Sequence, residues 1–403
     1  MKSPLAPARF GELPVVAGVR AATASRGLYA RAGLERPDTF LFAFDPGTCC
    51  AGVFTRSTTA SADVEWCRQA LAEGRGRARA LLVNAGNSNA FTGAFGQEKN
   101  AASLAALETA FDVPRQQCFL AATGVIGEPL PRPGYIGELV PGLAGALAPP
   151  DWETCARAFM TTDTFPKGAG RRGADYAIAG IAKGSGMIAP DMATMLAYVF
   201  TDAAIDPVAL DTMLRRATEA SFNRISVDGD TSTSDTLMVF ATGAAGVPAD
   251  MAAFESDLVA TCRALAELIV RDGEGARKLV RIRVGGAACE SDATQVGASI
   301  ANSPLVKTAL AAGDANWGRI IMAVGKSGVP VDREALRVWF GHHLVAEKGG
   351  RAASYSEEAA GAACTGEEIV IRVDLGGAGG HEIEFLTCDL THAYIDINGA
   401  YRT

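Results

Sequence analysis

Thr194 lies between a glycine-punctuated loop and an apolar run, an arrangement that suits a nucleophile. The sequence from Lys183 to Ala204 reads KGSGMIAPDMATMLAYVFTDAA. The run 195–200 is short and rich in large apolar side chains, which predicts a buried strand. A hydroxyl at the start of a strand is held rigidly, and the flexible loop before it leaves room for a substrate. The Ala193–Thr194 bond is a candidate for stored backbone strain.

A structural role for Thr194 is the simpler interpretation of this local pattern, because threonine is a favoured strand residue. A threonine hydroxyl is also a poor nucleophile until a base takes its proton. No histidine or carboxylate is obviously placed beside Thr194, and the four histidines all lie late in the chain. The local pattern by itself therefore leaves the role of Thr194 open.

Seven further blocks, spread in order over nearly the full length, accompany the Thr194 segment. They are VNAGNSNAFTG from Val83, AATGVIGEPLP from Ala121, TTDTFPK from Thr161, SFNRISVDGDTSTSDT from Ser221, RDGEGARK from Arg271, SPLVKTALAAGDANWGRI from Ser303 and YIDINGAYRT from Tyr394. With these blocks the chain resembles the ornithine acetyltransferase family, the bifunctional glutamate N-acetyltransferases of arginine biosynthesis. It departs from the family's usual pattern at Asp191, where asparagine is common.

The resemblance implies an architecture as well as an activity. The expected fold class is α/β (α+β), a layered sandwich of β-sheets between helices in an enzyme of the self-cleaving, N-terminal-nucleophile type. Cleavage at Ala193–Thr194 would divide the chain into an α fragment, residues 1–193, and a β fragment, residues 194–403. The family further implies a heterotetramer of two α and two β fragments.

Cleavage would also supply the missing base. It would begin with attack of Thr194 Oγ on the Ala193 carbonyl, and water would then resolve the ester formed by the N→O shift. The freed α-amino group of Thr194 has an ordinary pKa of about 7.7–8.0, so it can take the hydroxyl proton near neutral pH. The threonine then carries its own base.

Both the cleavage and the later acyl transfer build an oxyanion, which needs preorganised hydrogen-bond donors. The resemblance places this role on Thr123 and Gly124, within AATGVIGE. A hydroxyl beside a glycine N–H suits the role, although without the resemblance a simple Thr-Gly turn is the preferred interpretation.

The substrates that the resemblance implies are N2-acetyl-L-ornithine as donor and L-glutamate as acceptor. Each carries an α-carboxylate and a second charged end, so the pocket needs matched charges. Lys183, eleven positions before Thr194, could hold a carboxylate, and Glu274 could meet the ornithine ammonium group. The structural alternatives are a solvated loop lysine and a carboxylate at a helix end.

Four more substrate-binding positions are carried over from the family's motifs. Thr161 or its neighbour Thr162 would offer a hydroxyl, and Asn398 and Thr403 would bring the end of the chain into the site. A C-terminus is usually frayed, so an ordered tail in the site is a specific expectation. No cofactor is implied, while acetyl-CoA stays open as a second acetyl donor.

The bulk composition indicates a soluble globular protein, which the cysteine usage places in the cytoplasm. The net charge of −8 is mild for 403 residues, and no Lys/Arg cluster indicates nucleic-acid binding. We expect neither a signal peptide nor a membrane-spanning run. The nine scattered cysteines include no CxxC pair, which favours reduced, buried thiols and no zinc site.

Two short motifs resemble ligand-binding loops but lack required residues. GKS at 325–327 has isoleucine where a phosphate-binding loop needs its first glycine. DGDTSTSD from Asp228 lacks the glycine and the glutamate of a calcium loop, and we interpret it as a mainly structural, hydroxyl-rich turn. We therefore expect no metal site.

The elements that would position these residues alternate between strands and helices, and length suggests two or three domains. Strands are expected at 80–84, 196–201, 237–241, 279–284, 368–375, 383–388 and 393–398. Helices are expected at 98–111, 207–216 and 254–270, the last with Leu258, Cys262, Leu265 and Ile269 at helical spacing. The stretch 377–380 is expected to be a turn between two strands.

Two other functions remain open from sequence. A related N-terminal-nucleophile amidohydrolase or aminopeptidase would use water in place of glutamate, and the charged residues Lys183 and Glu274 argue against it. An uncleaved binding or regulatory protein on the same scaffold would show no effect of Thr194→Ala beyond minor stability changes.

Overall fold

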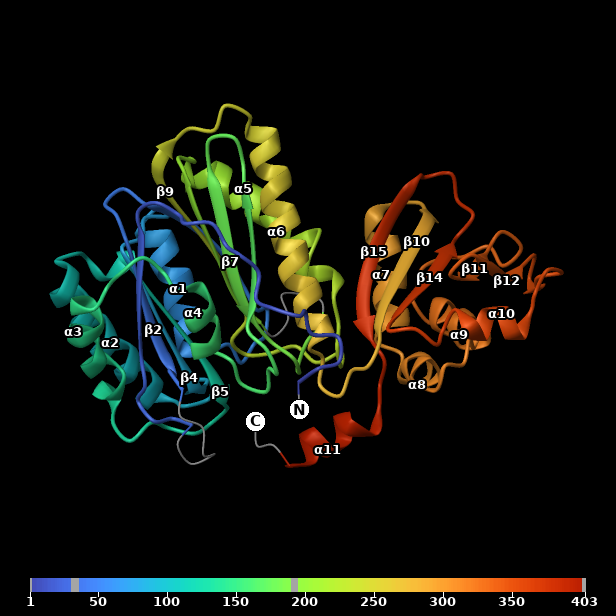
Figure 1. Ribbon diagram of the computed structural model, residues 1–403, viewed down its shortest axis with the longest axis horizontal. Coiled ribbons are helices and arrows are strands. Elements are labelled where there is room, and N and C mark those ends of the chain that lie inside the picture. Colours follow the sequence, from blue (N-terminus) through green and yellow to red (C-terminus); the bar gives the residue numbers. More distant parts are fainter. Residues whose placement is uncertain (1, 30–35, 190–194, 401–403) are drawn as a thin grey trace.

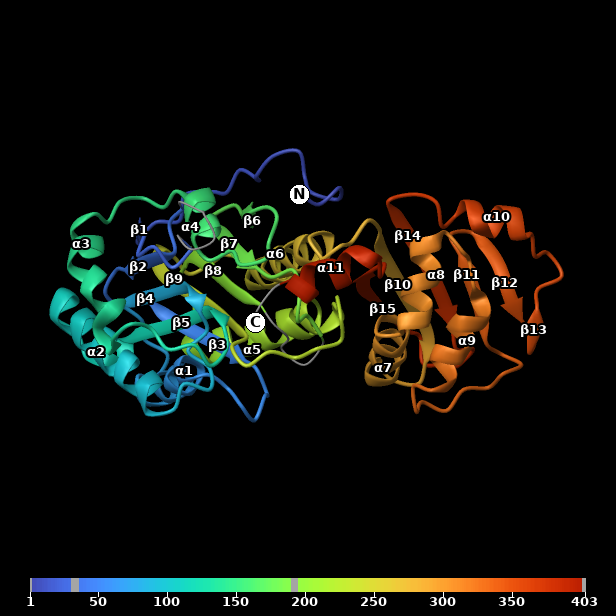
Figure 2. The same cartoon turned by 90° about the horizontal axis from the view of Figure 1, so that it is seen from below.

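A computed structural model of the chain describes residues 2–29, 36–189 and 195–400. Two lobes lie side by side, a larger one built from the first two-thirds of the chain and a smaller one that follows it (Figure 1). Helix α11 (His392–Ala400) runs back from the second lobe to the base of the first. Figure 2, seen from below, shows α11 between the two lobes.

Two sheets form the first lobe. One has the order β1 (Val19–Ala24), β2 (Thr39–Phe44), β4 (Ala80–Asn87), β5 (Cys118–Val125). The other has the order β3 (Cys49–Phe54), β9 (Thr236–Gly246), β8 (Leu196–Ala203), β7 (Ala177–Lys183), β6 (Lys167–Arg172). Within these two sheets, as far as the described residues go, β4–β5 and β8–β9 pair in parallel and the other neighbours are antiparallel. Strands from both sides of residues 193–194 thus share the second sheet.

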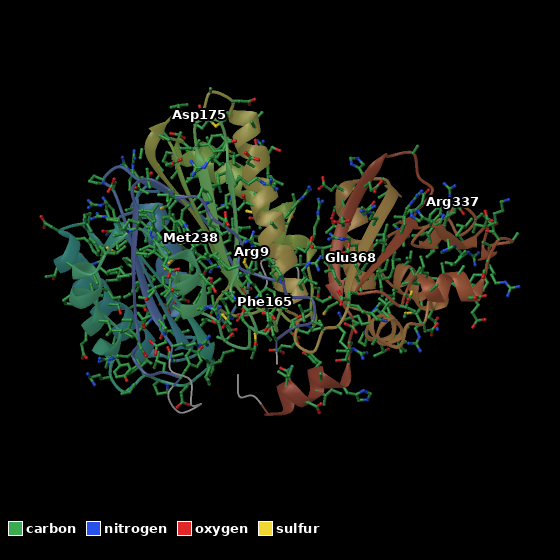
Figure 3. The ribbon with its side chains drawn as sticks, in the orientation of Figure 1. Arg9, Phe165, Asp175, Met238, Arg337 and Glu368 are labelled. Atoms are coloured by element: carbon green, nitrogen blue, oxygen red, sulfur yellow. The ribbon has the colours of Figure 1, made fainter. Side chains whose placement is uncertain are left out.

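The two sheets pack face to face over an aromatic core. Phe44 and Phe240 stack across it with ring centroids 4.4 Å apart, and Phe42 and Phe200 meet at 4.5 Å. Met238 belongs to the same core, and side chains fill the space between the ribbons (Figure 3). Large apolar side chains on the inward faces account for this layer, because their burial is the main stabilising term in folding.

Helices cover the outer faces of both sheets. On the second sheet lie α5 (Pro207–Glu219) and α6 (Met251–Arg271), whose Leu258, Cys262, Leu265 and Ile269 are buried as their spacing predicts. On the first sheet lie α2 (Ala94–Phe111) and α3 (Val140–Gly145). Helix α1 (Ala62–Glu73) packs on β3 and β5, and α4 (Trp152–Ala158) packs near β1, β6 and β7.

The second lobe has one six-stranded sheet with helices against it. The order is β13 (Gly350–Arg351), β12 (His343–Glu347), β11 (Arg337–Phe340), β14 (Glu368–Asp374), β10 (Leu279–Ala287), β15 (His381–Cys388). The helices of this lobe are α7 (Glu290–Ala301), α8 (Pro304–Ala312), α9 (Trp317–Gly325) and α10 (Glu357–Ala362). Short 3-10 turns lie at Arg115–Gln117, Pro133–Tyr135, Gly137–Leu139 and Phe222–Arg224.

The layered α/β architecture is confirmed, as are the three expected helices and all but one of the expected strands. The strand expected at 393–398 is wrong, because this segment is α11. Its alternating isoleucines favour a strand only weakly. The helix prevails because it brings Tyr394 and Asn398, one turn apart, against the first lobe, where Asn398 bonds to Glu274.

Candidate active site

A cavity of about 410 Å³ lies between the first lobe and α11, which contributes Tyr394 and Asn398 to its wall. Most of its lining residues have polar side chains, with hydroxyl, carboxylate, amide and ammonium groups. The lining residues are Ser88, Thr123, Gly124, Ile126, Thr161, Thr162, Lys183, Gly186, Met187, Asp228, Asp230, Thr231, Ser232, Thr233, Ser234, Glu274, Tyr394 and Asn398.

Seven residues that the sequence proposed for the site line this one cavity, although they span residues 123 to 398. They are Thr123, Gly124, Thr161, Thr162, Lys183, Glu274 and Asn398. The other three proposed residues, Ala193, Thr194 and Thr403, lie outside the described residues.

Met195, directly after Thr194 in sequence, lies just before β8 and is fixed by two hydrogen bonds. Its N–H donates to Asp235 Oδ1 at 2.9 Å, and its carbonyl accepts from the Thr236 N–H at 3.0 Å. Asp235 follows directly on the hydroxyl-rich residues Thr231–Ser234 of the cavity wall. Burial raises the pKa of the Asp235 carboxyl well above its ordinary value.

Thr123 and Gly124 lie in β5, at the end of its parallel pairing with β4, and not in a turn. Gly124 has a φ of +133°, and a Cβ there would lie 2.4 Å from the Gly86 carbonyl carbon. Only glycine fits this close approach. Ser88 holds the neighbouring turn against the strand, because its N–H and its hydroxyl both donate to the Val125 carbonyl.

Lys183 is the last residue of β7 and is buried, not a solvated loop lysine. No hydrogen bond or salt bridge joins its ammonium group to any residue that the structure describes. Burial lowers its pKa, while the nearby carboxylates of Asp163, Asp235 and Glu274 oppose that effect. A buried cation in a cavity wall that no described residue hydrogen-bonds is suited to bind an anion such as a carboxylate.

Glu274 adds a negatively charged carboxylate to the same cavity, opposite in sign to the Lys183 ammonium group. Asn398 Nδ2 donates to its Oε2 at 2.7 Å, and the Glu274 N–H donates to the Ser185 carbonyl at 2.9 Å. Gly186 allows the close packing here, since a Cβ at that position would lie 2.4 Å from the Glu274 carboxyl carbon. The carboxylate is buried but lines the cavity, where it can accept from an ammonium group.

Thr161 and Thr162 both face the cavity but are held differently. Thr162 Oγ1 shares a hydrogen bond of 2.7 Å with Ser185 Oγ. The Thr161 N–H donates to Asp163 Oδ2 at 2.9 Å. Either threonine can therefore present a hydroxyl to a bound molecule.

Sequence reasoning missed two parts of the wall. Tyr394 was not proposed, yet its hydroxyl donates to Asp228 Oδ2 at 3.3 Å on the cavity surface. The segment Thr231–Ser234, interpreted as a structural turn, also lines the cavity. The four consecutive hydroxyl side chains of this segment were the sequence feature that could have indicated a place in the site. Asp228 accepts the N–H groups of Met187 and Ile188 at 2.6 and 2.8 Å, which ties that wall to the loop after β7.

The described residues contain neither a candidate metal cluster nor a membrane-spanning helix. No group of three or more His, Cys, Asp or Glu side chains there could hold a metal ion. No described helix is both long enough and apolar enough to cross a bilayer. All nine cysteines are free thiols, and only Cys289 is exposed.

Comparison with known proteins gives consistent matches. The sequence pattern of the ArgJ family matches residues 20–403. The arginine biosynthesis bifunctional protein ArgJ of Ruegeria pomeroyi is 52% identical over 407 residues, which span 100% of this chain and 98% of that protein. The relative of the same name in Bradyrhizobium diazoefficiens is 49% identical over 100% of this chain and 99% of its own length.

A solved structure of ArgJ from Bacillus halodurans is 40% identical to this chain, with a TM-score of 0.48. It covers 50% of this chain and 96% of its own. On the full-length sequence matches, the chain belongs to the ArgJ family.

Proposed function

We propose that the protein transfers the acetyl group of N2-acetyl-L-ornithine to L-glutamate in arginine biosynthesis, through an acetyl-Thr194 intermediate. The observation that carries the proposal is the single cavity. It brings Thr123 and Gly124 together with the carboxylate of Glu274 and with Lys183, whose ammonium group has no hydrogen-bonded partner among the described residues. Relatives across the full chain length are named arginine biosynthesis bifunctional proteins.

Maturation would come first. Thr194 Oγ attacks the Ala193 carbonyl, the C–N bond breaks in the N→O shift, and water hydrolyses the resulting ester. The products are an α fragment of residues 1–193 ending in a carboxylate and a β fragment of residues 194–403 beginning with a free amine. That amine is the base for the next reaction.

Acetyl transfer then takes two steps. The amine of Thr194 takes the hydroxyl proton while Oγ attacks the acetyl carbonyl, and ornithine leaves after its amide nitrogen has received that proton. The glutamate amine next attacks the ester, and N-acetylglutamate leaves as Oγ is reprotonated. Thr123 and Gly124 would stabilise the oxyanion of both steps, a contribution of about 10²–10³ in rate for each donor.

The charged groups of the cavity suit the two ends of these substrates. Lys183 would bind the α-carboxylate, and Glu274, oriented by Asn398, would bind the ornithine ammonium group. Thr161, Thr162 and Thr403 complete the proposed contacts. Since glutamate also has a carboxylate for Lys183, one cavity can take donor and acceptor in turn.

The remaining features of the proposal follow from the same chemistry. No cofactor is needed, because nucleophile and base belong to one residue, and acetyl-CoA is proposed as an alternative acetyl donor to be tested. We also propose a cytoplasmic enzyme, in line with its nine free cysteines, and a heterotetramer of two α and two β fragments. No nucleic-acid or membrane partner is proposed.

The test combines intact mass with a transfer assay. Wild type should give two fragments, the second beginning at Thr194, and Thr194→Ala should stay one chain. Purified wild type should make N-acetylglutamate only when glutamate is present, from acetylornithine and, in a separate arm, from acetyl-CoA. Release of acetate at the same rate without glutamate would indicate a hydrolase instead. A folded but uncut and inactive wild type would contradict the proposal.

A further inference from the structure

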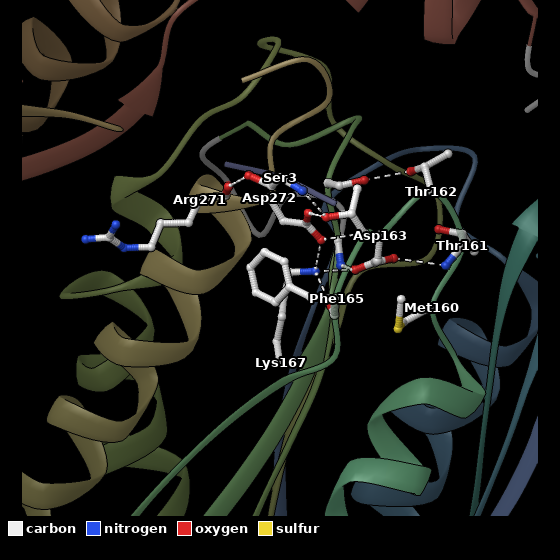
Figure 4. A network of polar contacts seen from close by, with 12 residues as sticks. Ser3, Met160, Thr161, Thr162, Asp163, Phe165, Lys167, Arg271 and Asp272 are labelled. Atoms are coloured by element: carbon white, nitrogen blue, oxygen red, sulfur yellow. Dashed lines mark hydrogen bonds and ion pairs between the residues drawn. The ribbon is translucent and has the colours of Figure 1, made fainter. Parts of the chain in front are cut away.

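Asp163 is a fully buried carboxylate that joins three segments of the chain (Figure 4). Its Oδ1 accepts hydrogen bonds from Lys167 Nζ at 2.6 Å and from the Gly184 N–H at 2.7 Å. Its Oδ2 accepts from the Thr161 N–H at 2.9 Å. Thr161 lines the cavity on one side, and Gly184 directly follows Lys183 on the other.

Lys167 extends the connection to a third site segment. Its Nζ donates to Asp272 Oδ2 at 2.6 Å and to the Phe165 carbonyl at 3.3 Å. Asp272 accepts the Thr164 N–H at 2.9 Å and lies at the end of α6. Glu274 follows two residues later, so one buried network reaches three of the segments that carry cavity residues, those of Thr161, Lys183 and Glu274.

Neither Asp163 nor Lys167 lines the cavity. Any effect of Asp163 on a bound substrate must therefore act through the groups that it holds. We propose that Asp163 is a positioning residue, which fixes the backbone at Thr161 and Gly184 so that Thr161 and Lys183 engage the same substrate. This inference rests on the proposed function.

The charge of Asp163 also bears on Lys183. The charged groups that face the Lys183 ammonium are Asp163, Lys167, Asp235 and Glu274. Burial lowers the pKa of Lys183, and the Asp163 carboxylate opposes this by favouring the charged ammonium. Removal of the Asp163 charge should lower the Lys183 pKa further, so Lys183 would lose its proton at a lower pH.

The central variant is Asp163→Asn in the full chain. This variant leaves the positive charge of Lys167 paired with the negative charge of Asp272, so it should lower the unfolding free energy less than the loss of Lys167 does. The asparagine NH2 group cannot accept a hydrogen bond, so at least one of the three contacts of Asp163 is lost. Because Thr161 and Gly184 donate to different oxygens of Asp163, we expect faster hydrogen exchange at whichever of these two amides faces the NH2 group.

Steady-state kinetics give the second readout. We expect the KM for acetylornithine to rise about 10- to 100-fold, as for a misplaced binding group, with a smaller change in kcat. The alkaline limb of the pH profile of kcat/KM, which reports Lys183, should move to lower pH. The acid limb, which reports the Thr194 amine, should stay in place.

Asp63→Asn is the matched control. Asp63 is an equally buried carboxylate, bonded to Lys99 Nζ at 2.8 Å, and it does not line the cavity. The Asp63→Asn variant should have a lower unfolding free energy than wild type. Its KM for acetylornithine and both limbs of its pH profile of kcat/KM should stay unchanged. Asp163→Glu keeps the anion but displaces it, so it should raise KM and leave the alkaline limb near its wild-type position.

Hydrogen exchange in Asp163→Asn that is unchanged at both Thr161 and Gly184 would overturn the proposal. Faster exchange at either amide with an unchanged KM for acetylornithine would overturn it as well. If Asp163→Asn does not fold, a wild-type KM in Asp163→Glu would overturn it equally. The exchange readout does not depend on catalysis. A wild type without transfer activity therefore counts against the proposed function, while the exchange result still decides whether Asp163 positions the two segments.

Discussion

Two buried lysines on neighbouring strands have opposite surroundings. Lys167 begins β6 and pairs in register with Ala182, the residue before Lys183 at the end of β7. Lys167 Nζ has three acceptors, two of them carboxylates, and they raise its pKa against the effect of burial. Lys183 has no hydrogen-bonded partner among the described residues, and burial lowers its pKa.

The difference separates a structural cation from one that is suited to bind substrate. A buried ion pair is stable only when its charges and hydrogen bonds are satisfied within the protein. Lys167 meets this condition, whereas Lys183 leaves its charge to be satisfied by a molecule in the cavity. The two lysines should therefore respond oppositely to the same substitution.

Lys167→Met should give the largest effect. It leaves the carboxylates of Asp163 and Asp272 buried without their counter-ion, which should cost about 3–5 kcal/mol of unfolding free energy. Urea unfolding at neutral pH measures this, with Lys183→Met as the matched control. Equal stability losses in the two variants would contradict the distinction drawn between the lysines.

Lys183→Met should instead remove function. Loss of a buried charge that pairs with a substrate carboxylate should cost about 2–4 kcal/mol, so kcat/KM should fall about 30- to 1,000-fold. The unfolding free energy should stay constant or rise by up to about 1 kcal/mol, because the variant removes a buried charge that has no hydrogen-bonded partner among the described residues. A kcat/KM within twofold of wild type would show that Lys183 does not bind substrate.

Lys99→Met should fall between these two variants in stability. Lys99 Nζ donates to a single carboxylate, Asp63, whose other oxygen still accepts from Asn89 Nδ2 at 2.7 Å. We expect a loss of about 1–3 kcal/mol, smaller than that for Lys167 because one partner of the carboxylate remains. Unfolding curves of the three variants, recorded together, would establish or refute this order.

The smallest effect should be the alkaline pH dependence of stability. Lys167 has a folded-state pKa above its ordinary value of 10.5, so its contribution is complete below that value and is lost as pH rises through the folded-state pKa. Lys183 has a folded-state pKa below 10.5, so its unfavourable contribution is relieved between the two values. Relative to wild type, Lys183→Met should therefore lose its stability advantage as pH approaches 10.5, which pH-dependent unfolding can measure.

The sequence could predict elements whose signal is local. The spacing of Leu258, Cys262, Leu265 and Ile269 predicted α6, because helix periodicity is visible within one window. Helix α11 could not be predicted in this way, since its conformation depends on contacts of Tyr394 and Asn398 with the distant first lobe.

The same limit applies to the site. Residue motifs identified seven of its lining positions, but the burial of Lys183 depends on strand pairing and on the lobe around it. The bond between Lys167 and Asp272 joins residues 105 positions apart, and neither residue carries a sequence signal for that partner. Chemistry can be read from residue type and motif, whereas charge satisfaction requires the folded chain.

The shared sheet of the first lobe has a thermodynamic consequence for a chain cut between residues 193 and 194. Strands β3, β6 and β7 would belong to one polypeptide and β8 and β9 to the other, paired by the ladders of β7–β8 and β3–β9. Unfolding would then release two molecules where an uncut chain releases one. The melting temperature of the cut protein would rise with protein concentration. Refolding of the cut protein would be a second-order reaction, because the two fragments must first associate. The uncut chain, by contrast, would refold in a first-order reaction.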